Sequence, residues 1–289
     1  MKKIAFAFLL VAGISISCEE SKKPQTTGAR TEVTIENPTN FVGLSSEINW
    51  GKLNPARGEN SPVAGNVWGD RTKDVATGFL VKFKEGFSSP PHIHNVTYRA
   101  IVVKGAVHND DPAAENMWMG PHSFWTQPKG LSHITSASEE ENIAYVEIDA
   151  GPYLVRPTGQ AFTSDEVPIN IDSSNLIWLN STESRWLPAN SKVKISFLWE
   201  KNDSLRMRGL YLKMPEGFEG KLVSDGNIFQ SIIISGALNY TMPEDDQAKI
   251  LDVGSHFGAT SKAVHDIKNT GLGEALIYVR TNGSIQLTN

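Results

Sequence analysis

The chain repeats itself once along its length, and this repeat constrains its fold more than any other feature. A shift of 131 residues, the separation between Trp68 and Trp199, superimposes identical residues over much of the chain. It aligns Gly78 with Gly209, Lys82 with Lys213, Glu85–Phe87 with Glu216–Phe218, Ile101 with Ile232, and Gly105–Ala106 with Gly236–Ala237. A shift of 132 residues aligns His133 with His265. Self-similarity at a fixed shift indicates two tandem copies of one structural unit.

Both copies have the sequence pattern of β-strands. Short runs rich in β-branched and aromatic residues recur between clusters of Gly, Pro, Asn and Asp, and no long stretch has helical spacing. The clearest runs are residues 78–83, 98–103, 142–148, 193–199, 231–235 and 275–279. Such runs are typical of a sandwich or a barrel. With 289 residues, of which 39% are hydrophobic, the chain can bury a core in each of two domains. We therefore predict an all-β protein.

The first residues have the composition of a secretory signal. Lys2 and Lys3 precede an apolar stretch over residues 4–16, which is too short for a transmembrane helix. Cys18 is the only cysteine of the chain. The segment resembles a lipoprotein signal peptide, whose processing leaves a lipid-modified cysteine as the new N-terminus. Residues 19–30 are polar, as expected of a flexible tether. We predict an exported lipoprotein of the bacterial cell envelope, anchored to the membrane by this lipid alone.

The repeat and the shifts in composition divide the chain into five parts. These are the signal peptide (1–17), the lipidated N-terminus and tether (18–31), the first domain (32–158), a linker rich in Ser, Thr, Asp, Asn and Pro (159–181), and the second domain (182–289). The formal net charge is -5 and Lys and Arg form no dense patch, which excludes a nucleic-acid partner. The sequence also lacks a Gly-x-Ser-x-Gly nucleophile turn and a Walker phosphate loop.

Three histidines of the first copy are spaced as metal ligands. His92 and His94 stand two residues apart, so they share one face of an extended strand, and Tyr98 has the same parity. His133 follows a turn at residues 128–130, and a hairpin could bring it beside the first two. Three imidazoles that leave a coordination position open are typical of a catalytic metal site. We expect one divalent ion per chain, and the ligands alone do not distinguish Zn, Fe, Mn and Ni.

The spacing of these residues resembles the two motifs of the cupin family. The matching patterns are Gly86-x5-His92-x-His94-x3-Tyr98-x6-Gly105 for the first motif and Pro128-x-Gly130-x2-His133 for the second. The resemblance implies two tandem cupin barrels, each a double-stranded β-helix or jelly roll, with the metal in the first. Within the superfamily the chain is similar to bacterial bicupins of uncharacterised function, related to the cupin domain of zinc-binding anti-sigma factors. A fold of this kind implies little about the reaction.

Tyr98 occupies the position of the usual glutamate ligand of that family. A phenol has a pKa of about 10, so it does not simply replace a carboxylate. Two arrangements stay open: a shell of three histidines and water, or Tyr98 just outside the shell as a hydrogen-bond donor or proton carrier. In the second arrangement Tyr98 would be the nearest general acid or base. Glu147, in the predicted strand 142–149, could complete the shell, and its alternative is a solvated place on the outer face.

The second copy keeps one of the four side chains of this pattern, which are His92, His94, Tyr98 and His133 in the first copy. His265 corresponds to His133, whereas Val223, Asp225 and Phe229 replace the other three. We expect this copy to serve as a scaffold. Three functions are compatible with the whole pattern: a metal-dependent enzyme acting on a small oxygenated molecule, a ligand-binding or sensing module without turnover, and a structural role on the cell envelope. In the enzyme, the ion would act as a Lewis acid or, if it is iron, would activate O2.

Overall fold

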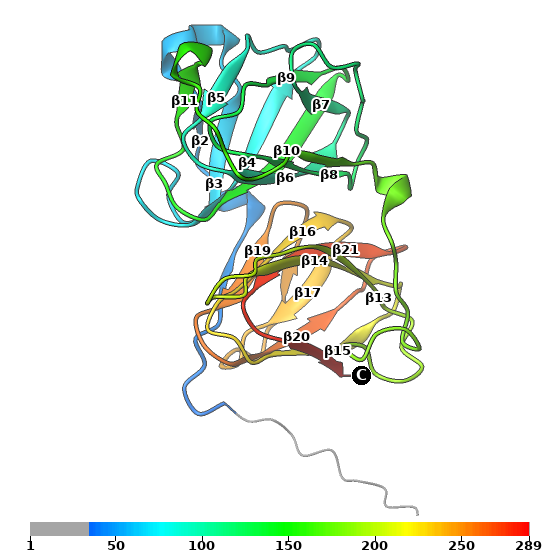
Figure 1. Ribbon diagram of the computed structural model, residues 1–289. Helices are drawn as coiled ribbons and strands as arrows, with labels where there is room; N and C mark the ends of the chain where they lie inside the picture. The colour runs from blue at the N-terminus through cyan, green and yellow to red at the C-terminus, as the bar shows by residue number, and fades with distance from the viewer. Residues whose placement is uncertain (1–34, 289) are drawn as a thin grey trace, which may run out of the picture. The chain divides into compact units, whose positions relative to one another are not determined.

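The computed structural model describes residues 35–288, which form two β-barrels in succession along the chain (Figure 1). The helical segments of this range are short 3-10 turns: η1 (Ser45–Glu47), η2 (Pro55–Asn60), η3 (Thr158–Gln160) and η4 (Ser173–Asn175). Among these residues no helix has the length and apolar character needed to cross a membrane. The prediction of an all-β chain is confirmed. The predicted signal peptide, Cys18 and the tether lie outside the described residues.

The first barrel is built on a seven-stranded antiparallel sheet with the order β12-β8-β6-β10-β4-β3-β2. Its strands are β2 (Trp50–Lys52), β3 (Val63–Trp68), β4 (Thr77–Lys84), β6 (Tyr98–Lys104), β8 (Phe124–Gln127), β10 (Glu141–Ile148) and β12 (Ile169–Ile171). Two short antiparallel pairs complete the barrel: β5 (His92–His94) with β11 (Val155–Pro157), and β7 (Val107–Asp110) with β9 (Ile134–Ala137).

The second barrel consists of a six-stranded and a five-stranded sheet. The first has the order β1-β19-β16-β21-β14-β13 and contains β1 (Phe41–Gly43), β13 (Lys194–Glu200), β14 (Arg208–Met214), β16 (Phe229–Ser235), β19 (His256–Ala259) and β21 (Ala275–Thr281). The other has the order β18-β17-β20-β15-β22 and contains β15 (Glu219–Ser224), β17 (Leu238–Thr241), β18 (Lys249–Leu251), β20 (Ala263–Lys268) and β22 (Ile285–Thr288).

The residues that repeat in the sequence build the same local packing in each barrel. In the first, the indole Nε1 of Trp68 donates to the hydroxyl of Tyr145 at 3.0 Å. Gly78 lies against this pair, and a Cβ there would come within 2.3 Å of the indole nitrogen and 2.5 Å of the hydroxyl. The second barrel has the same arrangement, built from Trp199, Gly209 and Tyr278. The repeated glycine therefore has a packing reason, since no larger residue fits beneath the pair.

Two edge strands join barrels other than the sequence-based domain bounds predict. β1 lies within the predicted first domain, yet it pairs with β19 of the second barrel. β12 lies within the predicted linker, yet it pairs with β8 of the first barrel. Each strand covers the free edge of a short strand, whose unpaired N–H and C=O groups need partners. The pairing partner of a three-residue edge strand depends on the folded structure rather than on local sequence.

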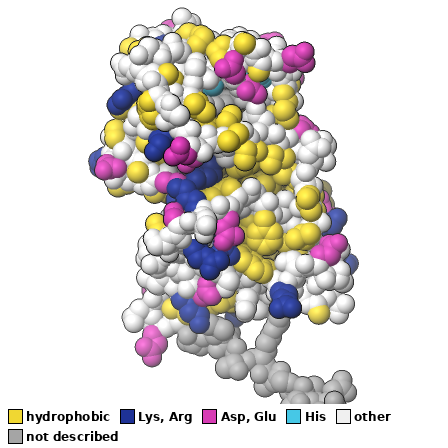
Figure 2. Space-filling view, in the orientation of Figure 1, with side chains coloured by type: hydrophobic (Ala, Val, Ile, Leu, Met, Phe, Trp, Pro, Cys, Tyr) yellow, Lys and Arg dark blue, Asp and Glu magenta, His cyan; other side chains and the backbone are white. Residues whose placement is uncertain are grey.

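The barrels pack together through an apolar cluster that contains side chains of both. On the face seen in Figure 2, hydrophobic side chains gather where the two barrels adjoin. The buried members are Val67, Leu80, Ile101, Val103, Phe124 and Tyr145 of the first barrel, with Tyr211, Ile232, Ile234, Leu276 and Tyr278 of the second. Charged groups also lie in this contact, among them Glu147 and Arg280.

Glu147 is buried in this contact, with 1% of its surface exposed. Its carboxylate accepts hydrogen bonds from Tyr278 Oη at 2.8 Å and from Arg280 Nη1 at 3.3 Å, both from the second barrel. Tyr145 Oη donates to it from the same strand at 3.3 Å. Glu147 therefore does not complete the metal shell, because it is outside the histidine group. The other alternative is wrong as well: Glu147 lies on the outer face of its barrel, but side chains of the other barrel cover it and it is not solvated. The sequence left the face of Glu147 open, and it could not show that the other barrel covers that face.

We predict that Glu147→Gln destabilises the protein by about 3 kcal/mol, because removing one member of a buried ion pair leaves its partner without full compensation. Urea denaturation of the purified chain measures this change. Glu141→Gln is the matched control on the same strand, since Glu141 pairs with Lys104 in an exposed position, where ion pairs contribute little. Equal unfolding midpoints for the two variants would contradict the prediction.

Candidate metal centre

The structure brings the three predicted histidines together. His92 and His94 lie on β5, and His133 lies just before β9, which follows a turn at Gly130. The backbones of His92 and His133 pair directly, with an N–H to O distance of 3.0 Å in both directions. One potential ligand atom from each ring lies within 4.8 Å of those of the other two. All three side chains are buried, so the group is a candidate site for one metal ion.

Each imidazole is oriented by a backbone carbonyl. His92 Nδ1 lies 2.9 Å from the oxygen of Pro90, His94 Nδ1 lies 3.1 Å from that of Leu154, and His133 Nδ1 lies 3.3 Å from that of Leu131. A carbonyl can only accept, so Nδ1 carries the proton and Nε2 keeps its lone pair. In known metal sites, a histidine ligand likewise donates its other ring N–H to a carbonyl, a carboxylate or water. The three Nε2 atoms are therefore the candidate ligand atoms, and a metal ion bound to His94 would replace the hydrogen bond that Tyr153 Oη donates to its Nε2 at 3.2 Å.

The Nε2 atom of His133 fits this assignment. It is buried and has no hydrogen-bond partner among the described residues. The equivalent Nε2 of His265 in the second barrel is also unpaired, so it is the convergence of three rings that distinguishes the first barrel. A buried polar atom without a partner costs free energy. A metal ion bound by the three rings would satisfy that atom, so the residues present fit such an ion.

Burial keeps the histidines neutral. It lowers the pKa of His133 to about 3, with a further contribution from the charge that His92 would carry. It also lowers the pKa of His94 well below its usual value, and the neighbouring His133 and His92 lower it further. The pKa of His92 is lowered by burial too. Neutral imidazole is the form that binds metals, so no ligand has to lose a proton near pH 7.

Tyr98 lies beside the histidines but its hydroxyl is already used. The hydroxyl donates to Asn109 Oδ1 at 2.9 Å and accepts from Trp125 Nε1 at 3.4 Å. Thr135 donates to the same amide oxygen. Burial raises the pKa of Tyr98 above its ordinary value. The phenol is therefore neutral and does not replace the carboxylate ligand, and its predicted role as an acid or base stays a prediction.

Tyr153 is a member of the site that the sequence analysis missed. Its ring stacks on His94, with 4.4 Å between ring centroids and 23° between planes. Its hydroxyl lies 3.2 Å from His94 Nε2, the atom that would bind the metal. Tyr153 belongs to the segment between β10 and β11 and to no motif. Only the folded structure places it near the histidines.

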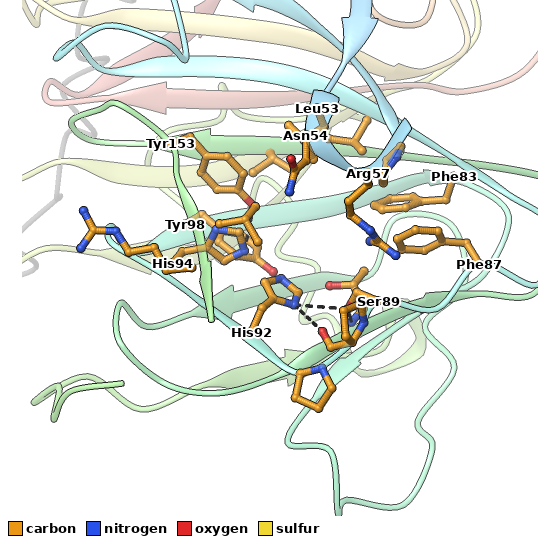
Figure 3. A pocket seen from close by; sticks show the side chains of 18 of the residues that line it. Leu53, Asn54, Arg57, Phe83, Phe87, Ser89, His92, His94, Tyr98 and Tyr153 are labelled. Atoms are coloured by element: carbon orange, nitrogen blue, oxygen red, sulfur yellow. Dashed lines mark hydrogen bonds between the residues drawn. The ribbon is translucent and has the colours of Figure 1, made fainter. Parts of the chain in front are cut away.

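A cavity of about 490 Å³ opens beside the histidines (Figure 3). His92, His94, Tyr98 and Tyr153 line one part of it. In the view of Figure 3, Arg57, Phe83 and Phe87 lie opposite His94. This volume is within the range of small-molecule sites. The candidate metal centre is thus accessible to a ligand from the cavity side.

In the second barrel the equivalent space is filled. The ring of His265 stacks on Phe229, with 4.4 Å between centroids. Its Nδ1 lies 3.0 Å from Tyr240 Oη and 3.2 Å from Asn40 Nδ2. Asp225 instead accepts from the backbone and side chain of Ser284. Within residues 35–288, the one cluster of His, Cys, Asp or Glu side chains close enough together to bind a metal ion is His92, His94 and His133 of the first barrel.

The fold and the site define an all-β protein of two tandem barrels with a buried group of three histidines in the first. The chain belongs to the family whose model is described as "Domain of unknown function (DUF4437)", which matches residues 42–288. No relative was found among curated proteins.

Several solved structures have a similar fold. A putative dioxygenase from Nostoc punctiforme matches with a TM-score of 0.64 and 16% identity, over 84% of this chain and 82% of the other. The formate complex of Lactobacillus farciminis oxalate decarboxylase matches with a TM-score of 0.58 and 12% identity, over 88% and 89%. Bacillus subtilis oxalate decarboxylase, described with its Mn(II) centres, matches with a TM-score of 0.52 and 14% identity, over 87% and 78%. At these identities the similarity establishes the fold, and the predicted tandem cupin barrels are confirmed.

We predict that Gly130→Ala weakens metal binding at the candidate centre. Gly130 has a φ of 76° and donates its N–H to the carbonyl of His94. A Cβ there would lie 2.5 Å from the carbonyl oxygen of Phe162, so the turn that leads to His133 must move. Titration of the purified variant with Zn²⁺ or Mn²⁺ measures the affinity.

Gly86→Ala is the control for Gly130→Ala. Gly86 also has a positive φ, of 65°, but a Cβ there has nothing within 4 Å. Both variants pay the left-handed backbone strain of about 1 kcal/mol. Only Gly130→Ala adds the clash, so equal metal affinities in the two variants would contradict the prediction.

Proposed function

We propose that the chain is a metal-dependent cupin whose first barrel holds one divalent ion between His92, His94 and His133 and presents it to a small oxygenated molecule. The observation that carries this proposal is the convergence of three neutral imidazoles, each oriented by a carbonyl, two of which, His92 and His94, line a cavity. Three protein ligands leave positions open for water or a ligand. An ion bound there would act as a Lewis acid on a carbonyl or hydroxyl oxygen.

The structurally similar proteins support a small-molecule function of this kind. Two of them are described as an oxalate decarboxylase and one as a putative dioxygenase. The Mn(II) centres belong to the Bacillus enzyme. For this chain Mn, Fe, Zn and Ni all suit a neutral imidazole set, and availability decides among them.

A binding or sensing module without turnover is the alternative, and the chemistry of the cavity favours it in one respect. The cavity lining contains the phenols of Tyr98 and Tyr153 but no carboxylate. Burial raises the pKa of both phenols, so neither accepts or releases a proton readily near neutral pH. A relation to the cupin domains of anti-sigma factors would suit this alternative. Turnover of a bound molecule by the metal-loaded protein would decide for the enzyme.

We predict that the purified protein, after reconstitution, holds close to one divalent ion per chain. The double variant His92→Ala and His94→Ala removes two of three ligands and loses the ion. Elemental analysis after removal of free metal measures both. His122→Asn is the control, because His122 lies outside the group and has a φ of 72°, which Asn tolerates. A wild-type protein that takes up none of Zn, Fe, Mn or Ni would overturn the proposal.

We also propose that the protein is an exported lipoprotein of the cell envelope, held to a membrane by a lipid on Cys18. The support is the sequence pattern of Lys2, Lys3, the apolar residues 4–16 and the single cysteine. The full-length chain expressed in a bacterial host is expected in the membrane fraction and in the detergent phase of a phase separation. Cys18→Ser is expected in the soluble fraction, and an unchanged distribution would contradict the anchor.

A further inference from the structure

We propose that the cavity beside the histidines binds a monocarboxylic acid with an apolar body, and that Arg57 pairs with its carboxylate. The acid is the small molecule of the proposed function, on which this assignment rests. Arg57 lines one part of the cavity, and His92 and His94 line another (Figure 3). The acid would therefore be held at its charged end while its body extends along the cavity toward the metal centre.

Arg57 has a free guanidinium group at the cavity. Its side chain is half-buried and forms no ion pair or hydrogen bond with any residue from 35 to 288. Its closest specific contact is the ring of Phe87, 5.6 Å from the guanidinium carbon. The nearest acid in the sequence, Glu59, pairs with Lys52 instead. A guanidinium group forms two parallel hydrogen bonds with a carboxylate, so it suits such a ligand.

Arg57 lines the same cavity as two of the candidate metal ligands, His92 and His94 (Figure 3). A molecule that pairs with Arg57 can therefore extend along this cavity toward the histidines.

The lining of the cavity is largely apolar. Its walls include Leu53, Val81, Phe83, Phe87, Val146 and Val155, and its other polar members include Asn54, Ser89 and Thr135. Such walls favour a ligand with a hydrocarbon body. Oxalate, the substrate class in the names of two similar proteins, consists of two carboxylates with no apolar part. The cavity of about 490 Å³ is also far larger than oxalate requires.

The charge around the cavity agrees with an anionic ligand. The lining residues include a second arginine, Arg156 on β11, and no Asp or Glu. Arg156 is exposed, and its side chain has no hydrogen bond or ion pair with the rest of the described chain. The protein as a whole carries a formal net charge of -5. Because the rest of the protein is negatively charged, the two arginines of the lining attract anions to this cavity in particular.

The test is calorimetric titration of the metal-loaded, purified protein with three probes: 3-phenylpropanoate, 3-phenylpropanol and oxalate. We expect the wild type to bind the acid about tenfold or more tightly than the alcohol, since hydrogen bonds to charged groups contribute about 1.5–3 kcal/mol. Oxalate is expected to bind more weakly than the acid. Arg57→Gln is expected to remove the preference for the acid and to leave the affinity for the alcohol unchanged.

Arg185→Gln is the matched control. It makes the same change in net charge on an exposed residue of the second barrel, so it is expected to leave all three affinities unchanged. Three results would overturn the assignment: equal affinities of the wild type for acid and alcohol, an Arg57→Gln variant that keeps the preference, or tighter binding of oxalate.

Two outcomes separate this inference from the proposed function. If the wild type takes up no metal but binds 3-phenylpropanoate, and Arg57→Gln loses that binding, the proposed function fails and the binding site stands. If the wild type binds the metal, and the acid affinity is lost in the double variant His92→Ala and His94→Ala but kept in Arg57→Gln, the carboxylate binds the ion and the assignment to Arg57 fails.

Discussion

The buried ion pair between Glu147 and Arg280 is the interaction on which the arrangement of the two barrels depends. Both residues occupy the same place in the repeat, one on β10 and one on β21, and each is almost completely buried. Arg280 also pairs with Asp149 at 2.7 Å. Burying these charges is costly unless every one is paired, and the pairs form only when the two sheets meet in one register. The apolar cluster around them supplies attraction, whereas the charges specify one geometry.

The strand β6 connects this contact to the metal centre. Tyr98 and Arg99 are adjacent, so their side chains point to opposite faces of the sheet. Tyr98 lies beside the histidines, and Arg99 lies over the ring of Trp199 of the second barrel at 3.8 Å. Arg99 also lies 3.2 Å from Asp149. The second barrel therefore covers and fixes the back of the sheet that forms the floor of the site.

The sequence predicted what depends on local spacing. The parity of His92 and His94 follows from strand geometry, and the repeat follows from matching residues, so fold and histidine group could both be inferred. Tyr153 and Arg57 reach the cavity from connecting segments, whose paths no local pattern determines. The sequence left open whether Glu147 faces the metal shell or the outside, and its burial could not be predicted because burial depends on the other barrel. The edge strands β1 and β12 likewise depend on which strand they meet after folding.

The two barrels show how one fold can keep or lose a site. In the second barrel the space of the metal centre holds His265, packed between Phe229 and Phe257 and hydrogen-bonded to Tyr240. Asn40, from the segment just before β1, completes this packing. A filled barrel gains buried apolar surface and hydrogen bonds, and so stabilises the pair. A buried ring nitrogen without a partner occurs in both barrels, at His133 and at His265, so it does not distinguish them. Among residues 35–288, three histidines converge in the first barrel alone, and a cavity of about 490 Å³ opens beside them. The first barrel is therefore the one that offers a ligand both room and binding groups.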